Sequence, residues 1–146
     1  MAKNSGGTRS SKTLKVYNIG GHKEYKVGDI FKNSVPNDGV SDYAVREIGQ
    51  EMFMFSGGMK MNVNINNIYP TQETVKVSAV NEYKAKSGEG IQGVKVGEKV
   101  YIFDGHHRAA AQILNKKKTI QINIVEVSKS KFEKKKMEAM EEFGWM

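Results

Sequence analysis

Residues Val100–Leu114 read VYIFDGHHRAAAQIL, a strand pattern that runs directly into a helix pattern. The first four side chains are β-branched or aromatic, as in a buried strand, and Ala109–Leu114 is rich in strong helix formers. The polar residues between them therefore mark a strand-to-helix turn. Gly105 permits close approach of the backbone to a ligand, and the amides of a helix's first turn attract anions. This turn is the first candidate for a phosphate site.

Three side chains at this turn have chemistry that suits phosphate. Arg108 can make bidentate, charge-assisted contacts with phosphate, and its alternative role is a structural salt bridge. His106 shares a helical face with Ala110 and Leu114, so it either contacts phosphate or packs into the core with a capped ring nitrogen. His107 lies on a neighbouring face and is the preferred general acid or base, because imidazole titrates near neutral pH.

Asp104 has two possible roles at the same turn. As the N-cap it would bond the helix amides and stabilise the helix by roughly 1 kcal/mol. A carboxylate there would repel bound phosphate unless a divalent cation bridged the two, and Mg²⁺ is commonly held in that way. The metal hypothesis therefore assigns Asp104 to Mg²⁺ or Mn²⁺. A zinc site is disfavoured because adjacent histidines diverge on a helix and only His22 remains as a third imidazole.

The amino-acid composition limits the number of domains, the partners and the chemistry to be expected. The chain has 146 residues with 38% hydrophobic and 27% charged content, enough for a single domain with a core. The formal net charge of +7 favours polyanionic partners, namely nucleic acid or nucleotides. There is no cysteine, which excludes disulfides, thiolate metal sites and cysteine nucleophiles. No long apolar stretch or export leader is evident, so we expect a cytoplasmic protein without a membrane partner.

Other patterns predict the remaining elements. Short strands are expected on both sides of Gly20-Gly21, and residues 51–55 and 59–65 are expected to pair as a β-hairpin around Gly57-Gly58. Thr71 is the expected N-cap of a helix over residues 72–86. Strands are then expected at 93–96, 99–103 and 120–127, with a charged helix over 131–143.

Residues 62–127 resemble the ParB/sulfiredoxin superfamily, the group that includes ParB-like nuclease domains. The similarity rests on the IYPTQ motif that ends at Gln72, the strand at 93–96, the DGHHR motif with its alanines, and the strand at 120–127. Sulfiredoxins carry a catalytic cysteine where this chain has His106, which excludes sulfinic-acid reduction through cysteine. Partition proteins carry Glu and Arg at 106 and 107 and a following helix-turn-helix module, for which the residues after Val127 are too few.

The resemblance implies an α+β fold, with a small mixed sheet and helices, and a phosphate pocket. In this pocket Gly105, His106, His107 and Arg108 would hold a nucleoside triphosphate or another phosphoester. The resemblance also places the helix start at Gln72 and Glu73 on the pocket's edge. Gln72 would then contact base or sugar, and Glu73 would be a general base, unless its charge only stabilises the first turn of the helix.

Two function classes remain open. One is an enzyme, either a nuclease, a nucleotide hydrolase or a phosphotransferase related to free amino acid kinases, with His107, Arg108, Asp104 and Glu73 as catalytic residues. The other is a non-catalytic nucleotide- or nucleic-acid-binding module from a mobile element or toxin system. We expect four parts along the chain: a disordered basic arm at 1–12, a β-rich extension packed on the core at 13–61, the ParB/sulfiredoxin-like domain at 62–127 and a charged helix at 128–146.

Overall fold

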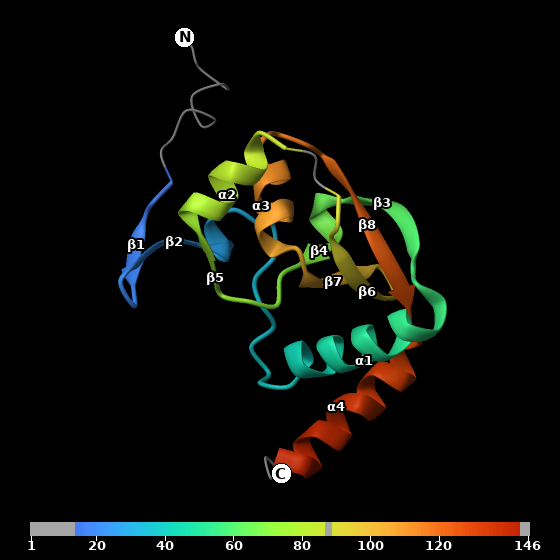
Figure 1. The fold of residues 1–146 in the computed structure, drawn as a ribbon. Coiled ribbons are helices and arrows are strands. Elements are labelled where there is room, and N and C mark those ends of the chain that lie inside the picture. Colours follow the sequence, from blue (N-terminus) through green and yellow to red (C-terminus); the bar gives the residue numbers. More distant parts are fainter. Residues whose placement is uncertain (1–13, 87–88, 144–146) are drawn as a thin grey trace.

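The computed structural model describes residues 14–86 and 89–143, and it shows a mixed α+β fold (Figure 1). One sheet has three strands and the other has five. The strands are β1 (Tyr17–Ile19), β2 (His22–Lys26), β3 (Met59–Asn64), β4 (Ile68–Tyr69), β5 (Thr74–Lys76), β6 (Gln92–Val96), β7 (Lys99–Asp104) and β8 (Thr119–Glu126). The helices are α1 (Ser41–Ser56), α2 (Val77–Lys84), α3 (His106–Leu114) and α4 (Lys129–Phe143), with short 3₁₀ turns at Val27–Asp29 and Ile65–Asn67.

The five-stranded sheet is the centre of the fold. Its order is β3-β8-β6-β7-β4, in which β6 pairs parallel to β8 and antiparallel to β7. The outer pairs are antiparallel for β3 with β8 and parallel for β4 with β7. The small sheet, β1-β2-β5, is antiparallel throughout and leads into α2. The expected mixed sheet is therefore present, and β7 runs through its interior to the start of α3.

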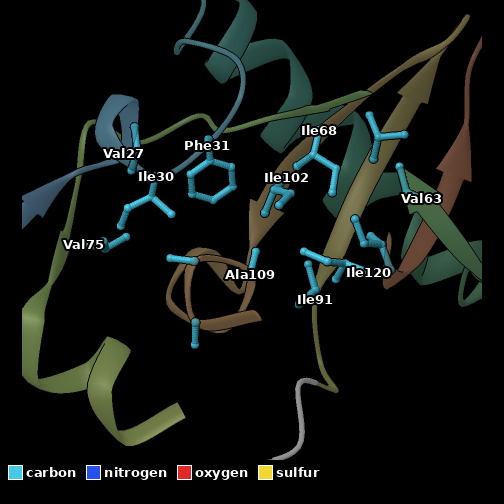
Figure 2. Packing of buried hydrophobic residues seen from close by; sticks show 14 of the residues in the cluster. Val27, Ile30, Phe31, Val63, Ile68, Val75, Ile91, Ile102, Ala109 and Ile120 are labelled. Carbon is cyan, nitrogen blue, oxygen red and sulfur yellow. The ribbon is translucent and has the colours of Figure 1, made fainter. Parts of the chain in front are cut away.

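Helices cover both faces of the central sheet (Figure 1). On one face, α3 and α2 enclose a core that includes Ile91, Ile102, Ala109 and Ile120 (Figure 2). On the other, α1 and α4 enclose a second cluster. This arrangement follows from strand alternation, because neighbouring residues of β7 such as Tyr101 and Ile102 point to opposite faces and both are buried. None of the described helices is long and apolar enough to cross a membrane.

The predicted hairpin of residues 51–55 with 59–65 is wrong in its first arm. Residues 51–55 lie in the last turns of α1, and β3 pairs with β8, far along the chain. Asp38 lies just before α1, and its carboxylate accepts hydrogen bonds from the backbone N–H groups of Val40 and Ser41 at 3.1 and 2.8 Å. Gly57 ends it in the left-handed conformation, with φ 71°. The expected β-rich extension at 13–61 therefore contains a helix of 16 residues.

Several of the other expected strands and helices are present. The strands on both sides of Gly20-Gly21 and the three later strands are present, and the charged C-terminal helix begins two residues early, at Lys129. The expected boundary between residues 61 and 62 falls inside β3, so the extension and the resembling segment share one sheet. The expected basic arm at 1–12 lies outside the described residues.

Candidate phosphate site at the start of helix α3

The turn from β7 into α3 depends on Gly105. Its φ is 90°, in the left-handed region, and a Cβ at this position would lie 2.9 Å from the Ile91 Cα and 3.1 Å from the Gly90 carbonyl oxygen. Both the backbone conformation and the close approach of the chain at 90–91 require glycine. Gly105 is the N-cap residue of α3, and no side chain caps the helix. The interpretation of Asp104 as the N-cap is therefore wrong: its side chain is exposed and its backbone ends β7.

His106 is a buried, neutral core histidine. Its side chain is 4% exposed, and its Nε2 accepts a hydrogen bond from the backbone N–H of Thr71 at 2.9 Å. Burial is the main cause that lowers the pKa of His106 to about 4, and electrostatic interactions with His107 and Arg46 act in the same direction. An imidazole that accepts at Nε2 and is neutral carries its proton on Nδ1. The packed alternative considered for this residue is thus the one that the structure contains.

His107 makes the same kind of hydrogen bond as His106, to a backbone N–H further along the same segment. It is half-buried, and its Nε2 accepts a hydrogen bond from the backbone N–H of Lys76 at 3.1 Å. Burial and the charge of Lys76 lower the pKa of His107, while Glu24 opposes that shift. The neutral form is therefore favoured here as well, and Nδ1 remains as the proton-bearing nitrogen.

The two histidines together attach the segment 71–76 to the start of α3. This segment is not the first turn of a helix as expected, because residues 74–76 form β5 and α2 begins only at Val77, after Lys76 as N-cap. Thr71 is not an N-cap either. Its hydroxyl donates a hydrogen bond to the Ile102 carbonyl oxygen at 2.6 Å, which joins the end of β4 to β7.

Gln72 and Glu73 lie on this attached segment. Gln72 is half-buried, and its Nε2 donates a hydrogen bond to the Thr74 carbonyl oxygen at 2.7 Å. The Glu73 side chain is exposed, while its backbone carbonyl accepts a hydrogen bond from the Val27 N–H at 2.9 Å. Their relation to α3 thus comes from the hydrogen bonds of His106 and His107 rather than from a helix start.

Arg108 is oriented by two neighbours outside the motif. Its guanidinium carbon lies 4.7 Å from the ring centroid of Tyr83 on α2. A Cβ on Gly90 would lie only 2.8 Å from the Arg108 Nη1, so the lack of a side chain at this position leaves room for the guanidinium. Among the described residues, no carboxylate lies within 4.0 Å of Arg108. The alternative of a structural salt bridge is therefore not realised in the described part of the chain.

Tyr83 and Gly90 were not expected to contribute. Their places in the sequence carry little signal, since Tyr83 fits a helical apolar spacing and Gly90 belongs to a turn-like SGEG stretch. Lys86 also lies near the Tyr83 ring, at 5.9 Å from its centroid, so two cations lie close to one aromatic ring. The resulting positive region adjoins the first turn of α3.

The metal hypothesis rests on Asp104 alone. Within residues 14–86 and 89–143, no group of three or more His, Asp or Glu side chains is arranged to hold a metal ion. Asp104 would therefore need phosphate oxygens and water as the remaining ligands, which is how Mg²⁺ is commonly bound. The exposed carboxylate fits that role, and the site offers no preformed protein cage among these residues.

Comparison with known proteins adds no family assignment. The sequence matches no protein-family model, and no curated protein matches it at a significant level.

Proposed function

We propose that this chain binds the phosphate groups of a nucleotide or nucleic acid at the start of α3, with Arg108 as the principal contact. The observation that carries the proposal is the state of its guanidinium. It is held by Tyr83 and Gly90, yet no carboxylate of the described residues neutralises it. A fixed guanidinium without an ion-pair partner is suited to bidentate phosphate recognition, because little side-chain freedom remains to be lost on binding.

The helix supplies further donors beside Arg108. In α3 the first hydrogen bond of the helical ladder runs from Ala109 N–H to the Gly105 carbonyl. The amides that precede Ala109 belong to the first turn, where an α-helix has no intrahelical acceptors. These amides and the helix dipole favour an anion at the same place. The net charge of +7 would draw a polyanion towards the domain.

The resemblance to ParB and sulfiredoxin domains supports the same location, because their phosphate pockets are formed by the matching glycine and arginine. In this proposal Gly105 provides the approach, and Gln72 contacts the base or sugar. His107 donates from Nδ1, the nitrogen that its bond to Lys76 leaves protonated. His106 acts through its hydrogen bond to Thr71, which holds the segment carrying Gln72 in place.

A second candidate is phosphoester hydrolysis or phosphoryl transfer, as in a nuclease, a nucleotide hydrolase or a free amino acid kinase. It is favoured by two exposed carboxylates, Asp104 at the end of β7 and Glu73 on the segment attached to α3. Asp104 would hold Mg²⁺ or Mn²⁺ against the phosphate, and Glu73 would act as general base. His107 would donate a hydrogen bond from Nδ1 to the developing oxyanion, since a neutral ring whose Nε2 accepts the Lys76 N–H carries its only proton there.

One set of measurements separates these functions. Fluorescence anisotropy with labelled single-stranded DNA, duplex DNA, RNA and ATP would be compared for the parent protein, Arg108→Gln and Lys117→Gln. The last variant removes the same charge from the turn beyond the other end of α3. We expect Arg108→Gln to weaken binding at least about tenfold, as for a lost charge-assisted contact, and Lys117→Gln to have a much smaller effect. Equal losses would contradict a localised site.

Catalysis is tested with the same variants. Each substrate is incubated with Mg²⁺ or Mn²⁺, and cleavage or phosphate release is followed. Turnover that Arg108→Gln, His107→Gln and Asp104→Asn each abolish would establish the enzyme. Binding that depends on Arg108, without turnover in the parent protein, would establish the binding module.

A further inference from the structure

A cavity lies at the opposite end of the central sheet from Arg108. It has a volume of about 480 Å³ and is formed by the β6–β7 turn, the loop before α1, Tyr69 of β4 and the first turns of α4. Cavities of about 300–1,000 Å³ are typical of small-molecule sites. The strand β7 separates it from the α3 start. Its six residues, at about 3.3 Å each, place the two sites roughly 20 Å apart.

A row of aromatic rings lines this cavity. The Tyr69 and Tyr101 ring centroids are 5.4 Å apart, and Tyr101 stacks on Phe132 at 5.5 Å with an interplanar angle of 20°. Tyr101 and Phe132 are 7% and 3% exposed, so their positions are fixed by packing. Tyr69 is the partly exposed member of the row, so its ring is the surface against which a flat ligand ring can pack, and the buried Tyr101 and Phe132 hold it in place.

The Tyr101 hydroxyl is a free polar group in this wall. It makes no hydrogen bond with the described residues, and none of their buried side-chain polar atoms lacks a partner. The hydroxyl therefore reaches solvent, and the cavity that Tyr101 lines is the space before it. Burial, Tyr69, Asp38 and Glu133 raise the pKa of Tyr101, which keeps the hydroxyl protonated and able to donate.

Equal numbers of acidic and basic residues line the cavity, but some of them already pair with one another. The lining contains three acidic and three basic residues, namely Asp38, Glu98, Glu133, Lys99, Lys129 and Lys136. Lys136 is engaged, with its Nζ 3.2 Å from Asp38 and 3.6 Å from Glu133. Asp38 also accepts hydrogen bonds from the start of α1.

The charged side chains that remain to bind a ligand include both positive and negative groups. Lys99 and Lys129 have no carboxylate of the described residues within 4.0 Å. The Lys99 Nζ lies 5.4 Å from the Tyr69 ring centroid, which places a cation beside the aromatic row. On the acidic side, Glu98 is unpaired among these residues, and two carboxylates share the single ammonium of Lys136.

From this combination we propose that the cavity binds a small zwitterion with an aromatic group, such as a free aromatic amino acid. The ring packs on Tyr69, near the Tyr101 hydroxyl, and the carboxylate is held by Lys99. The ammonium faces the acidic side of the cavity. A simple anion gains less here, because the six charged side chains of the lining sum to zero.

The test uses probes that each remove one part of the ligand. Isothermal titration calorimetry would compare L-phenylalanine with its amide, its N-acetyl derivative and 3-cyclohexyl-L-alanine. These probes lack the carboxylate, the ammonium and the aromatic ring, respectively. We expect saturable binding of L-phenylalanine and a loss of about tenfold or more for each modified probe. Failure of L-phenylalanine to bind saturably, or equal binding of all four compounds, would overturn the proposal.

Variants localise the binding. Lys99→Gln should weaken L-phenylalanine about tenfold and leave the weak binding of its amide unchanged, because the amide has no carboxylate to lose. Lys117→Gln, the matched loss of charge outside the cavity, and Arg108→Gln should both bind L-phenylalanine like the parent. Circular dichroism would confirm that the variants are folded. If Lys99→Gln binds L-phenylalanine as the parent does, the ligand lies elsewhere and the proposal fails, whatever Arg108 does with phosphate.

Discussion

The imidazole Nε2 of His106 accepts the backbone N–H of Thr71 at 2.9 Å, across 35 residues of sequence. This bond fixes the tautomer of a buried ring and joins the end of β4 to the first turn of α3. The neighbouring His107 does the same for Lys76. Two consecutive histidines, which as a motif suggest catalysis, therefore have a demonstrable structural role in holding one segment against another.

The first prediction concerns pH and follows from the lowered pKa of His106. Its pKa is about 4 in the folded chain against 6.5 for an unperturbed imidazole, so between these values the unfolded chain binds a proton that the native chain does not. Stability must then fall as pH falls through this window. From pH 7 to 4.5 the expected loss is roughly 2–3 kcal/mol, measured by urea unfolding at both values.

The matched variant is His106→Gln, which keeps an acceptor but cannot titrate. Its stability should depend less on pH over the same window, although His107, whose pKa is lowered too, contributes in the same direction. Hydrogen bonds to Asp38 outweigh its burial and hold its pKa below 3.8, so the acid destabilisation that it causes begins only near and below that value. An unchanged slope in His106→Gln would contradict the assignment.

The second prediction compares two glycines with positive φ. Gly105 and Gly97 have φ of 90° and 62°, but only Gly105 has backbone atoms within 4 Å of where a Cβ would stand. Gly97→Ala should cost about 1–2 kcal/mol, the usual strain of the left-handed conformation. Gly105→Ala should cost clearly more, about 3 kcal/mol or above, because the chain at Ile91 must also move. Equal shifts in the urea midpoint for the two variants would show that the close approach of the chain at Ile91 to Gly105 adds nothing to the cost.

Regular patterns explain which parts of the fold could be predicted. The strand at 120–127 alternates apolar and polar residues, and the strand at 99–103 ends in a turn with a glycine, so both were found. Residues 52–55 form a continuous run of large apolar side chains, MFMF, which suits a strand as well as a helix. Phe53 packs on Phe103, while Phe55 is 88% exposed, and that difference depends on tertiary packing.

In the candidate site, too, local sequence predicts some of the arrangement and tertiary packing decides the rest. Gly105 and Arg108 are chain neighbours, so their proximity could be read directly from the motif. The helix expected from Gln72 fails because Thr74–Lys76 pairs with β2, a strand 50 residues earlier whose register no local pattern specifies. The partners of Arg108 come from two other segments: Tyr83 lies on α2, which packs on α3, and Gly90 lies just before β6, so tertiary packing alone brings them to Arg108.

The third prediction tests the contact between α1 and β7. Gly49 lies in α1, where alanine would gain about 1 kcal/mol of helix propensity, but a Cβ there would collide with the Phe103 ring. Phe53 confines that ring, with centroids 5.6 Å apart. Gly49→Ala should therefore destabilise by about 1–3 kcal/mol in thermal or urea unfolding.

Its control is Gly28→Ala. Gly28 has no positive φ and nothing within 4 Å of a Cβ, so this change should be neutral or stabilise slightly. The cost of Gly49→Ala should also shrink when Phe103→Leu is present, because the smaller side chain leaves room. Additive effects in this double-mutant cycle would exclude the collision as the cause.

The last prediction concerns Tyr83 as a positioning residue for Arg108 and depends on the proposed phosphate site. The Tyr83 ring holds the guanidinium through a contact of 4.7 Å, so Tyr83→Leu should weaken phosphate binding by about three- to fivefold, corresponding to ~0.5–1 kcal/mol. Tyr83→Phe keeps the ring and should bind nucleic acid like the parent. The same substitutions made in Arg108→Gln should have little effect on binding, because the residue that they orient is absent. If Tyr83→Leu and Tyr83→Phe weaken binding equally, the hydroxyl and not the ring matters, and the positioning role is refuted.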